Sequence, residues 1–187
     1  MKASARPPQP PPDTARLKNP GLFFPKRSPD MTDPAPRLFA TDAAIRRVGE
    51  GLILRNLPRC EWTHEAHLAA CTFIVRDRPD IVPEREMGDI ISRCNESVGG
   101  VNDDTQGYHE TITQCFILAV RQHLRERPEA DTLLDAVNTL LLSDRGKRDW
   151  PLRLYSRERL FSVAARRQFV TPDIHANGSE LPENDSQ

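Results

Sequence analysis

Hydrophobic residues recur every three or four positions through the middle of the chain, which is typical of helices that bury one face. The pattern predicts helices at about residues 42–56, 64–78, 83–98, 108–125 and 129–142, with a short sixth helix at 157–166. No stretch shows the period-two alternation of a half-buried strand, and there is no internal repeat. The sequence therefore predicts an all-α, single-domain helical bundle of five helices plus a short sixth, spanning residues 38–170.

Polar and special residues mark where these helices begin and which of them is weak. Thr41, Thr63 and Ser156 each precede a predicted helix and have the hydroxyl that suits an N-cap. Gly49 and Gly51 fall inside the first helix, where glycine costs about 1 kcal/mol relative to alanine. We expect the first helix to be the least stable by local propensity.

The two ends of the chain have a different composition from the bundle. Residues 1–37 contain ten of the 17 prolines, which exclude regular hydrogen-bonded structure, so we expect a disordered Pro-rich tail. Met31 offers an alternative start close to the first helix. Residues 171–187 are polar and are expected to form a second disordered tail.

Composition narrows the class of protein without naming a function. Hydrophobic residues make up 37% and the formal net charge is -1, so nothing indicates a nucleic-acid or membrane partner. No apolar run reaches the roughly 18 residues of a membrane span, and no secretory signal is evident. The four cysteines form no CxxC pair, and we expect reduced thiols in a cytoplasmic protein. The oligomeric state is left open.

Three histidines form the one constellation with the makings of a metal site. His64 and His67 are three residues apart at the start of the second predicted helix and so share its inward face. His109 heads the apolar stripe of the fourth predicted helix. If the two stripes face each other, the imidazoles converge on one point, as a divalent metal such as zinc or iron requires.

Neighbouring polar residues supply the other parts of a catalytic site. Glu110 is the candidate fourth ligand or general base, and Tyr108 the candidate proton or hydrogen-bond donor. Asn95, near the end of the third helix, is a candidate to hold a ligand or substrate. Cys71 lies on the histidine face but one turn deeper, where a small buried cysteine is more often packing than ligand.

Two other patterns carry less weight. The loop at residues 100–107 alternates Asn102, Asp104 and Gln106, yet Thr113 stands where a calcium loop needs its glutamate, which excludes an EF-hand. Arginines from Arg153 to Arg167 suit an anion, although solvated helix faces explain them better.

Three segments carry a resemblance to a known group of proteins. Trp62–Leu68 (WTHEAHL), Tyr108–Thr113 (YHETIT) and Tyr155–Ser162 (YSRERLFS) resemble segments of small uncharacterised bacterial helical proteins. The arrangement is also loosely similar to DinB/YfiT-type bundles, in which three histidines hold a metal between helices. That resemblance implies a metal-binding bundle at the level of the fold alone.

Two hypotheses follow from these residues. In the first, the chain is a small metal-dependent enzyme, a hydrolase or another catalyst of metal-assisted chemistry on a small-molecule substrate. Its metal ligands are His64, His67 and His109. In the second, the chain is a non-catalytic helical module that binds a ligand or partner, and the histidines are structural. Convergent imidazoles favour the enzyme, whereas separate bonds to backbone carbonyls favour the module.

Overall fold

The computed structural model describes residues 35–127 and 132–174, and these residues are helical as expected, with no strand among them. The long helices are α1 (Asp42–Ile53), α2 (His64–Asp77), α3 (Pro83–Ser97), α4 (Glu110–Arg125) and α5 (Leu133–Leu142). Two short helices, α6 (Arg157–Leu160) and α7 (Val163–Arg167), follow. Single 3-10 turns form at η1 (Arg59–Glu61), η2 (Asp144–Gly146) and η3 (Trp150–Arg153). None of the helices described is both long and apolar enough to cross a membrane.

The predicted N-caps are confirmed. Thr41 accepts a hydrogen bond from the Ala44 amide, and Thr63 accepts one from the Ala66 amide. Ser156 caps α6 in the same way, through the Arg159 amide. Each hydroxyl satisfies one of the amides that a helix leaves unpaired in its first turn.

The first helix ends at Ile53 instead of about residue 56, and two further predicted helices also differ from those observed. The fourth begins at Glu110 instead of Tyr108, because His109 has extended backbone angles and is itself the N-cap. The predicted sixth helix is two helices, because Ser162 interrupts it and caps α7 through the Ala165 amide. The predicted fifth helix opens at residues 129–131, which lie outside the described residues, and Thr132 caps the observed α5. Most of both predicted tails also lies outside the described part of the chain.

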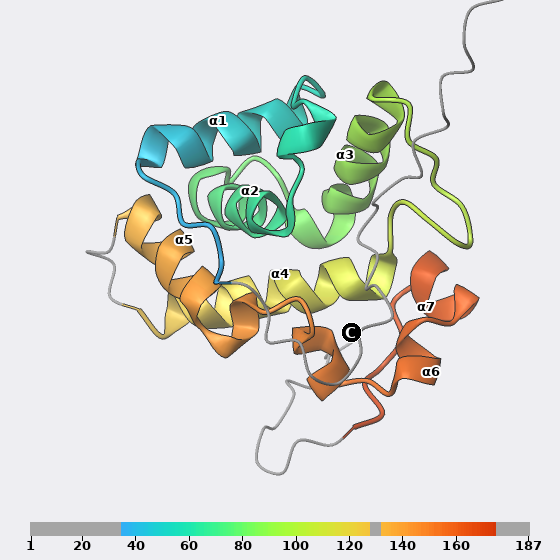
Figure 1. The fold of residues 1–187 in the computed structure, drawn as a ribbon. Helices are drawn as coiled ribbons and strands as arrows, with labels where there is room; N and C mark the ends of the chain where they lie inside the picture. The colour runs from blue at the N-terminus through green and yellow to red at the C-terminus, as the bar shows by residue number, and fades with distance from the viewer. Residues whose placement is uncertain (1–34, 128–131, 175–187) are drawn as a thin grey trace, which may run out of the picture.

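Helix α2 is the centre of the bundle. It packs against α1, α3, α4 and α5, and Figure 1 shows α1 and α3 near it with α4 crossing beneath. Every residue from Leu68 to Ile74 is buried. Because these consecutive residues point in all directions around the helix axis, the helix is buried on all sides. A helix that is apolar on all sides belongs inside a protein. The sequence predicted a one-sided stripe for this helix, whereas its neighbours enclose it on several sides.

The first helix contacts the centre through a glycine. A Cβ placed on Gly49 would lie 2.9 Å from Phe73 Cγ and still closer to Cδ1, and Phe73 is buried. The glycine that weakens α1 by propensity therefore lets α1 approach α2 closely.

Gly49→Ala is expected to destabilise the protein by about 1–3 kcal/mol, because the added methyl overpacks the α1–α2 contact. Gly51→Ala is the matched control, since a Cβ there meets its nearest side-chain atom at 3.3 Å. It is expected to be within about 1 kcal/mol of wild type, helped by the better helix propensity of alanine. Urea unfolding of the two variants compares them; equal stabilities would contradict the close-packing explanation.

Candidate functional site

His64 joins the start of α2 to the 3-10 turn η2. Its Nε2 lies 2.8 Å from the Gly146 carbonyl oxygen, and its side chain is buried, with a relative exposure of 7%. A carbonyl only accepts hydrogen bonds, so Nε2 carries the proton and donates it. Gly146 ends its turn, where backbone carbonyls are left without helical partners. The bond thus fastens the segment after α5 to the centre of the bundle.

His109 does the same for α6. Its Nε2 donates to the Leu160 carbonyl at 3.0 Å, and its Nδ1 accepts from the Ile112 amide at 3.4 Å as the N-cap of α4. Leu160 is the last residue of α6, so its carbonyl also lacks a helical partner. Both ring nitrogens of His109 are therefore occupied, and neither offers a free lone pair to a metal.

His67 differs from the other two histidines. Its Nδ1 lies 2.6 Å from the Thr63 carbonyl oxygen, so Nδ1 carries the proton and Nε2 has a free lone pair. The ring stacks on Trp62, with centroids 3.6 Å apart. Among the described residues, none forms a hydrogen bond with Nε2 of His67, whereas both ring nitrogens of His109 are bonded.

The three histidines do not form the metal site that the helical spacing predicted. Each bonds a different backbone carbonyl, of Gly146, Thr63 or Leu160. The described part of the chain contains no group of three or more His, Cys, Asp or Glu residues placed to hold a metal ion. The residues present therefore do not fit a zinc or iron centre.

Tyr108 and Glu110, two of the candidate catalytic residues, form a hydrogen bond with each other. The Tyr108 hydroxyl donates to Glu110 Oε2 at 2.6 Å, and the Gln114 amide donates to Glu110 Oε1 at 2.8 Å. Burial and the neighbouring Glu110 raise the pKa of Tyr108 well above its ordinary value, so the phenol keeps its proton. The two residues hold the first turns of α4 together, and no histidine enters their hydrogen bonds.

Asn95 holds the acidic loop between α3 and α4. Its amide donates to Asn102 Oδ1 at 3.0 Å, and the same oxygen accepts from the Tyr108 amide at 3.0 Å. Arg167 of α7 forms a two-bond ion pair with Asp104 of this loop, at 2.7 Å for each bond. Asn95 therefore has a structural role in this loop. Asn102 joins Asn95 to Tyr108, a role that the sequence pattern did not indicate.

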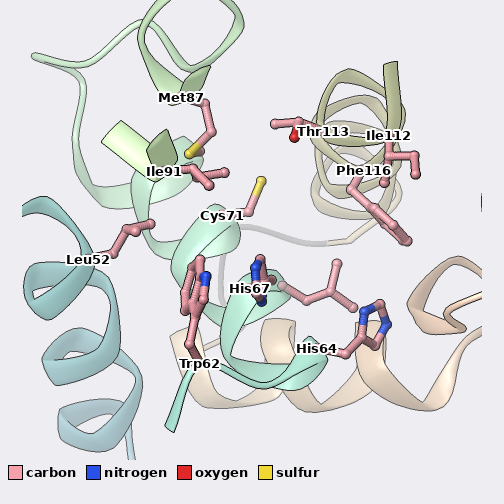
Figure 2. A pocket seen from close by; sticks show the side chains of 11 residues that line it. Leu52, Trp62, His64, His67, Cys71, Met87, Ile91, Ile112, Thr113 and Phe116 are labelled. Atoms are coloured by element: carbon pink, nitrogen blue, oxygen red, sulfur yellow. The ribbon is translucent and has the colours of Figure 1, made fainter. Parts of the chain in front are cut away.

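A small pocket lies where α1, α2, α3 and α4 meet, with a cavity volume of about 40 Å³. Figure 2 shows His67 beside Trp62 below Cys71, with Met87 and Ile91 of α3 above. The lining residues are Leu52, Trp62, His64, His67, Leu68, Cys71, Met87, Ile91, Ile112, Thr113 and Phe116. Three of the lining residues are partly exposed, and the others are buried. The partly exposed ones are Trp62, His67 and Thr113. Apart from Trp62 and Thr113, these side chains belong to the predicted inward stripes, yet only the packing decides which stripes meet.

Cys71 belongs to the wall of this pocket and has no chemical role there. Burial raises the pKa of its thiol to about 12, so it stays protonated and weakly nucleophilic at neutral pH. All four cysteines are free, in agreement with the prediction of unpaired thiols.

Comparisons with protein-family models, with curated proteins and with solved structures gave no match to this chain. The resemblance of the WTHEAHL and YHETIT segments to small bacterial helical proteins therefore stays a prediction.

The stability of the protein is expected to fall as the pH drops from about 6.5 to 4.5. Burial lowers the pKa of His67 to about 3 and that of His109 to about 4, from an ordinary 6.5. In this interval the unfolded chain binds protons that the folded chain does not, so acid favours unfolding, by up to about 1.4 kcal/mol per pH unit for each histidine.

Urea unfolding at several pH values measures this slope. Hydrogen bonds from Thr105 and Gln106 lower the pKa of Asp103 from 3.8 to about 2. The contribution of Asp103 to the free energy of unfolding therefore changes below about pH 4, outside the interval in which the histidines act. His67→Gln is expected to reduce the slope between pH 6.5 and 4.5. An unchanged slope in this variant would show that His67 titrates normally in the folded protein.

Proposed function

We propose that this protein is a non-catalytic helical module that binds a small ligand in the pocket between α1, α2, α3 and α4. The observation that carries the proposal is the free Nε2 lone pair of His67, on a ring that lines a predominantly apolar pocket. Binding pockets are commonly apolar with a few polar groups that orient the ligand. His64 and His109 serve the fold in this proposal.

The size of the pocket limits what enters it. A water molecule needs about 10–15 Å³ of such volume. The cavity of about 40 Å³ accordingly has room for roughly three non-hydrogen atoms. A cavity of about 150 Å³ is needed for benzene. The ligand is therefore a very small molecule, or a larger one that inserts only its end past Trp62 and Thr113.

The metal-dependent enzyme predicted from the sequence needs a rearranged site. His109 would have to release the Ile112 amide before Nδ1 became available, or give up both of its bonds before Nε2 did. A buried donor or acceptor left without a partner costs about 1–3 kcal/mol. The metal site is thus the less favoured proposal.

Xenon tests the pocket, because small apolar cavities take up this atom. Under xenon pressure, methyl resonances of Leu52, Met87 and Ile91 should shift in carbon-13 NMR spectra, whereas those of Val137 in α5 should not. Cys71→Leu should abolish the shifts by filling the space. Cys115→Leu is the matched control, since Cys115 is buried but does not line the pocket. It should keep the shifts.

Elemental analysis separates this proposal from the enzyme. Protein purified without a histidine tag, after growth with zinc and iron supplied, should contain far less than one metal ion per chain. Stoichiometric metal that is lost in His64→Ala, His67→Ala and His109→Ala alike would overturn the module in favour of the metal-dependent enzyme.

A further inference from the structure

Resting on this proposed function, we infer that the ligand is a neutral hydrogen-bond donor, a hydroxyl or N–H group on a short alkyl chain, that donates to Nε2 of His67. The inference concerns the chemistry of the group that enters the pocket. It follows from the proton positions, the charges and the size of the pocket.

The tautomer of His67 is set by its surroundings. The Thr63 carbonyl accepts both the His67 amide at 3.0 Å and the Nδ1 proton at 2.6 Å. Rotating the ring by half a turn would place a carbon against this carbonyl and lose the bond. The stacked Trp62 ring further restricts rotation. Nε2 is therefore a fixed acceptor, which pairs with a donor and repels another lone pair.

Among the other polar groups of the lining, only the indole N–H of Trp62 is a good hydrogen-bond donor. The Thr113 hydroxyl gives its proton to the His109 carbonyl at 2.9 Å, which leaves its oxygen as an acceptor. The Nε2 proton of His64 is already on the Gly146 carbonyl. The Cys71 thiol is only a weak donor. The pocket thus presents acceptors and the single indole donor of Trp62, and a hydroxyl group is able to donate to Nε2 of His67 and to accept from that indole.

Charge excludes ionised ligands. The lining contains no Asp, Glu, Lys or Arg. A carboxylate would meet an acceptor with no cation to compensate it, and an ammonium group would lose its water without a carboxylate in return. A hydroxyl or a neutral N–H group makes the bond to Nε2 of His67 at a small desolvation cost.

Size sets the rest of the ligand. About three non-hydrogen atoms fit inside, and the lining around Met87, Ile91 and Leu52 is aliphatic. A short alkyl group meets both conditions. 1-Propanol has this chemistry, with three carbons for the space and a hydroxyl for His67, and propionate and propylammonium are close to it in length but charged.

The experiment compares these three probes on the full chain at pH 7. NMR titration followed at the Met87 methyl should give millimolar binding of 1-propanol and at least tenfold weaker binding of the two charged probes. The nitrogen-15 resonance of His67 Nε2 should move in the direction of hydrogen-bond acceptance with 1-propanol alone. Equal binding of all three probes, or a pocket that keeps only water, would overturn the inference.

A variant pair tests the acceptor. His67→Phe keeps a ring beside Trp62 but removes Nε2, and it should bind xenon while losing the preference for 1-propanol. His123→Phe is the control, because His123 is buried but does not line the pocket. It should keep both. If His67→Phe does not fold, the nitrogen-15 shift in the wild type decides.

Xenon separates the two proposals. Xenon binding without 1-propanol binding overturns the ligand class and leaves the binding module standing. Failure of xenon to enter the wild-type pocket overturns the module itself, and the ligand class with it.

Discussion

His109→Ala is expected to destabilise the protein by about 2–4 kcal/mol. The change removes the N-cap of α4, worth about 0.5–2 kcal/mol, and leaves the Leu160 carbonyl without its donor, at a cost of about 1–3 kcal/mol. The side chain is buried, with a relative exposure of 4%, so water does not replace either bond without rearrangement. Thermal and urea unfolding measure the loss.

His109→Asn divides this effect into its two parts. Asparagine is a good N-cap residue and restores the bond to the Ile112 amide, but it is too short to replace the ring at Leu160. Its stability should fall between those of His109→Ala and the wild type. A His109→Ala variant as stable as the wild type that had lost a bound metal would instead identify His109 as a ligand.

Phe116→Ala is expected to destabilise the protein by about 3–5 kcal/mol and to create a binding site for benzene. Phe116 is nearly buried, makes an edge contact with His64 at 5.5 Å between centroids, and lines the pocket. Removing a buried ring leaves a cavity whose size sets much of the cost. The space left by the Phe116 ring joins the existing pocket, because Phe116 is part of the pocket lining.

Benzene should raise the melting temperature of Phe116→Ala and leave that of the wild type unchanged. A ligand that binds only the folded state stabilises it by mass action. The wild-type pocket, at about 40 Å³, is too small for the ring. Benzene stabilisation of both proteins, or of neither, would contradict the pocket geometry.

The helices and their caps could be predicted from sequence because these features are local. Thr41, Thr63 and Ser156 cap the helices that the apolar spacing predicted, since an N-cap depends on residues two or three positions away. The start of α4 was missed by two residues because histidine is an uncommon cap. Ser162 was missed as a cap because it follows Ser156 too closely to suggest a second helix.

The candidate site was predicted in part. His64 and His67 do share a pocket with Leu68 and Cys71, as their common helix face indicated. The described residues are not gathered into a group that could hold a metal, because spacing says nothing about where a ring nitrogen finds its partner. That partner is Gly146 for His64 and Leu160 for His109, which lie 82 and 51 residues further along the chain.

The sequence by itself thus determined the all-α class, the order of the helices and most of their ends, because periodicity and capping act within a few residues. The tertiary structure decided the use of the histidines. Two of them satisfy carbonyls left open at the ends of short helical turns, and the third bonds the carbonyl of Thr63, the N-cap of its own helix, and lines the pocket. Those carbonyls come within reach only after distant segments pack, since an unpaired buried carbonyl is costly wherever the fold places it.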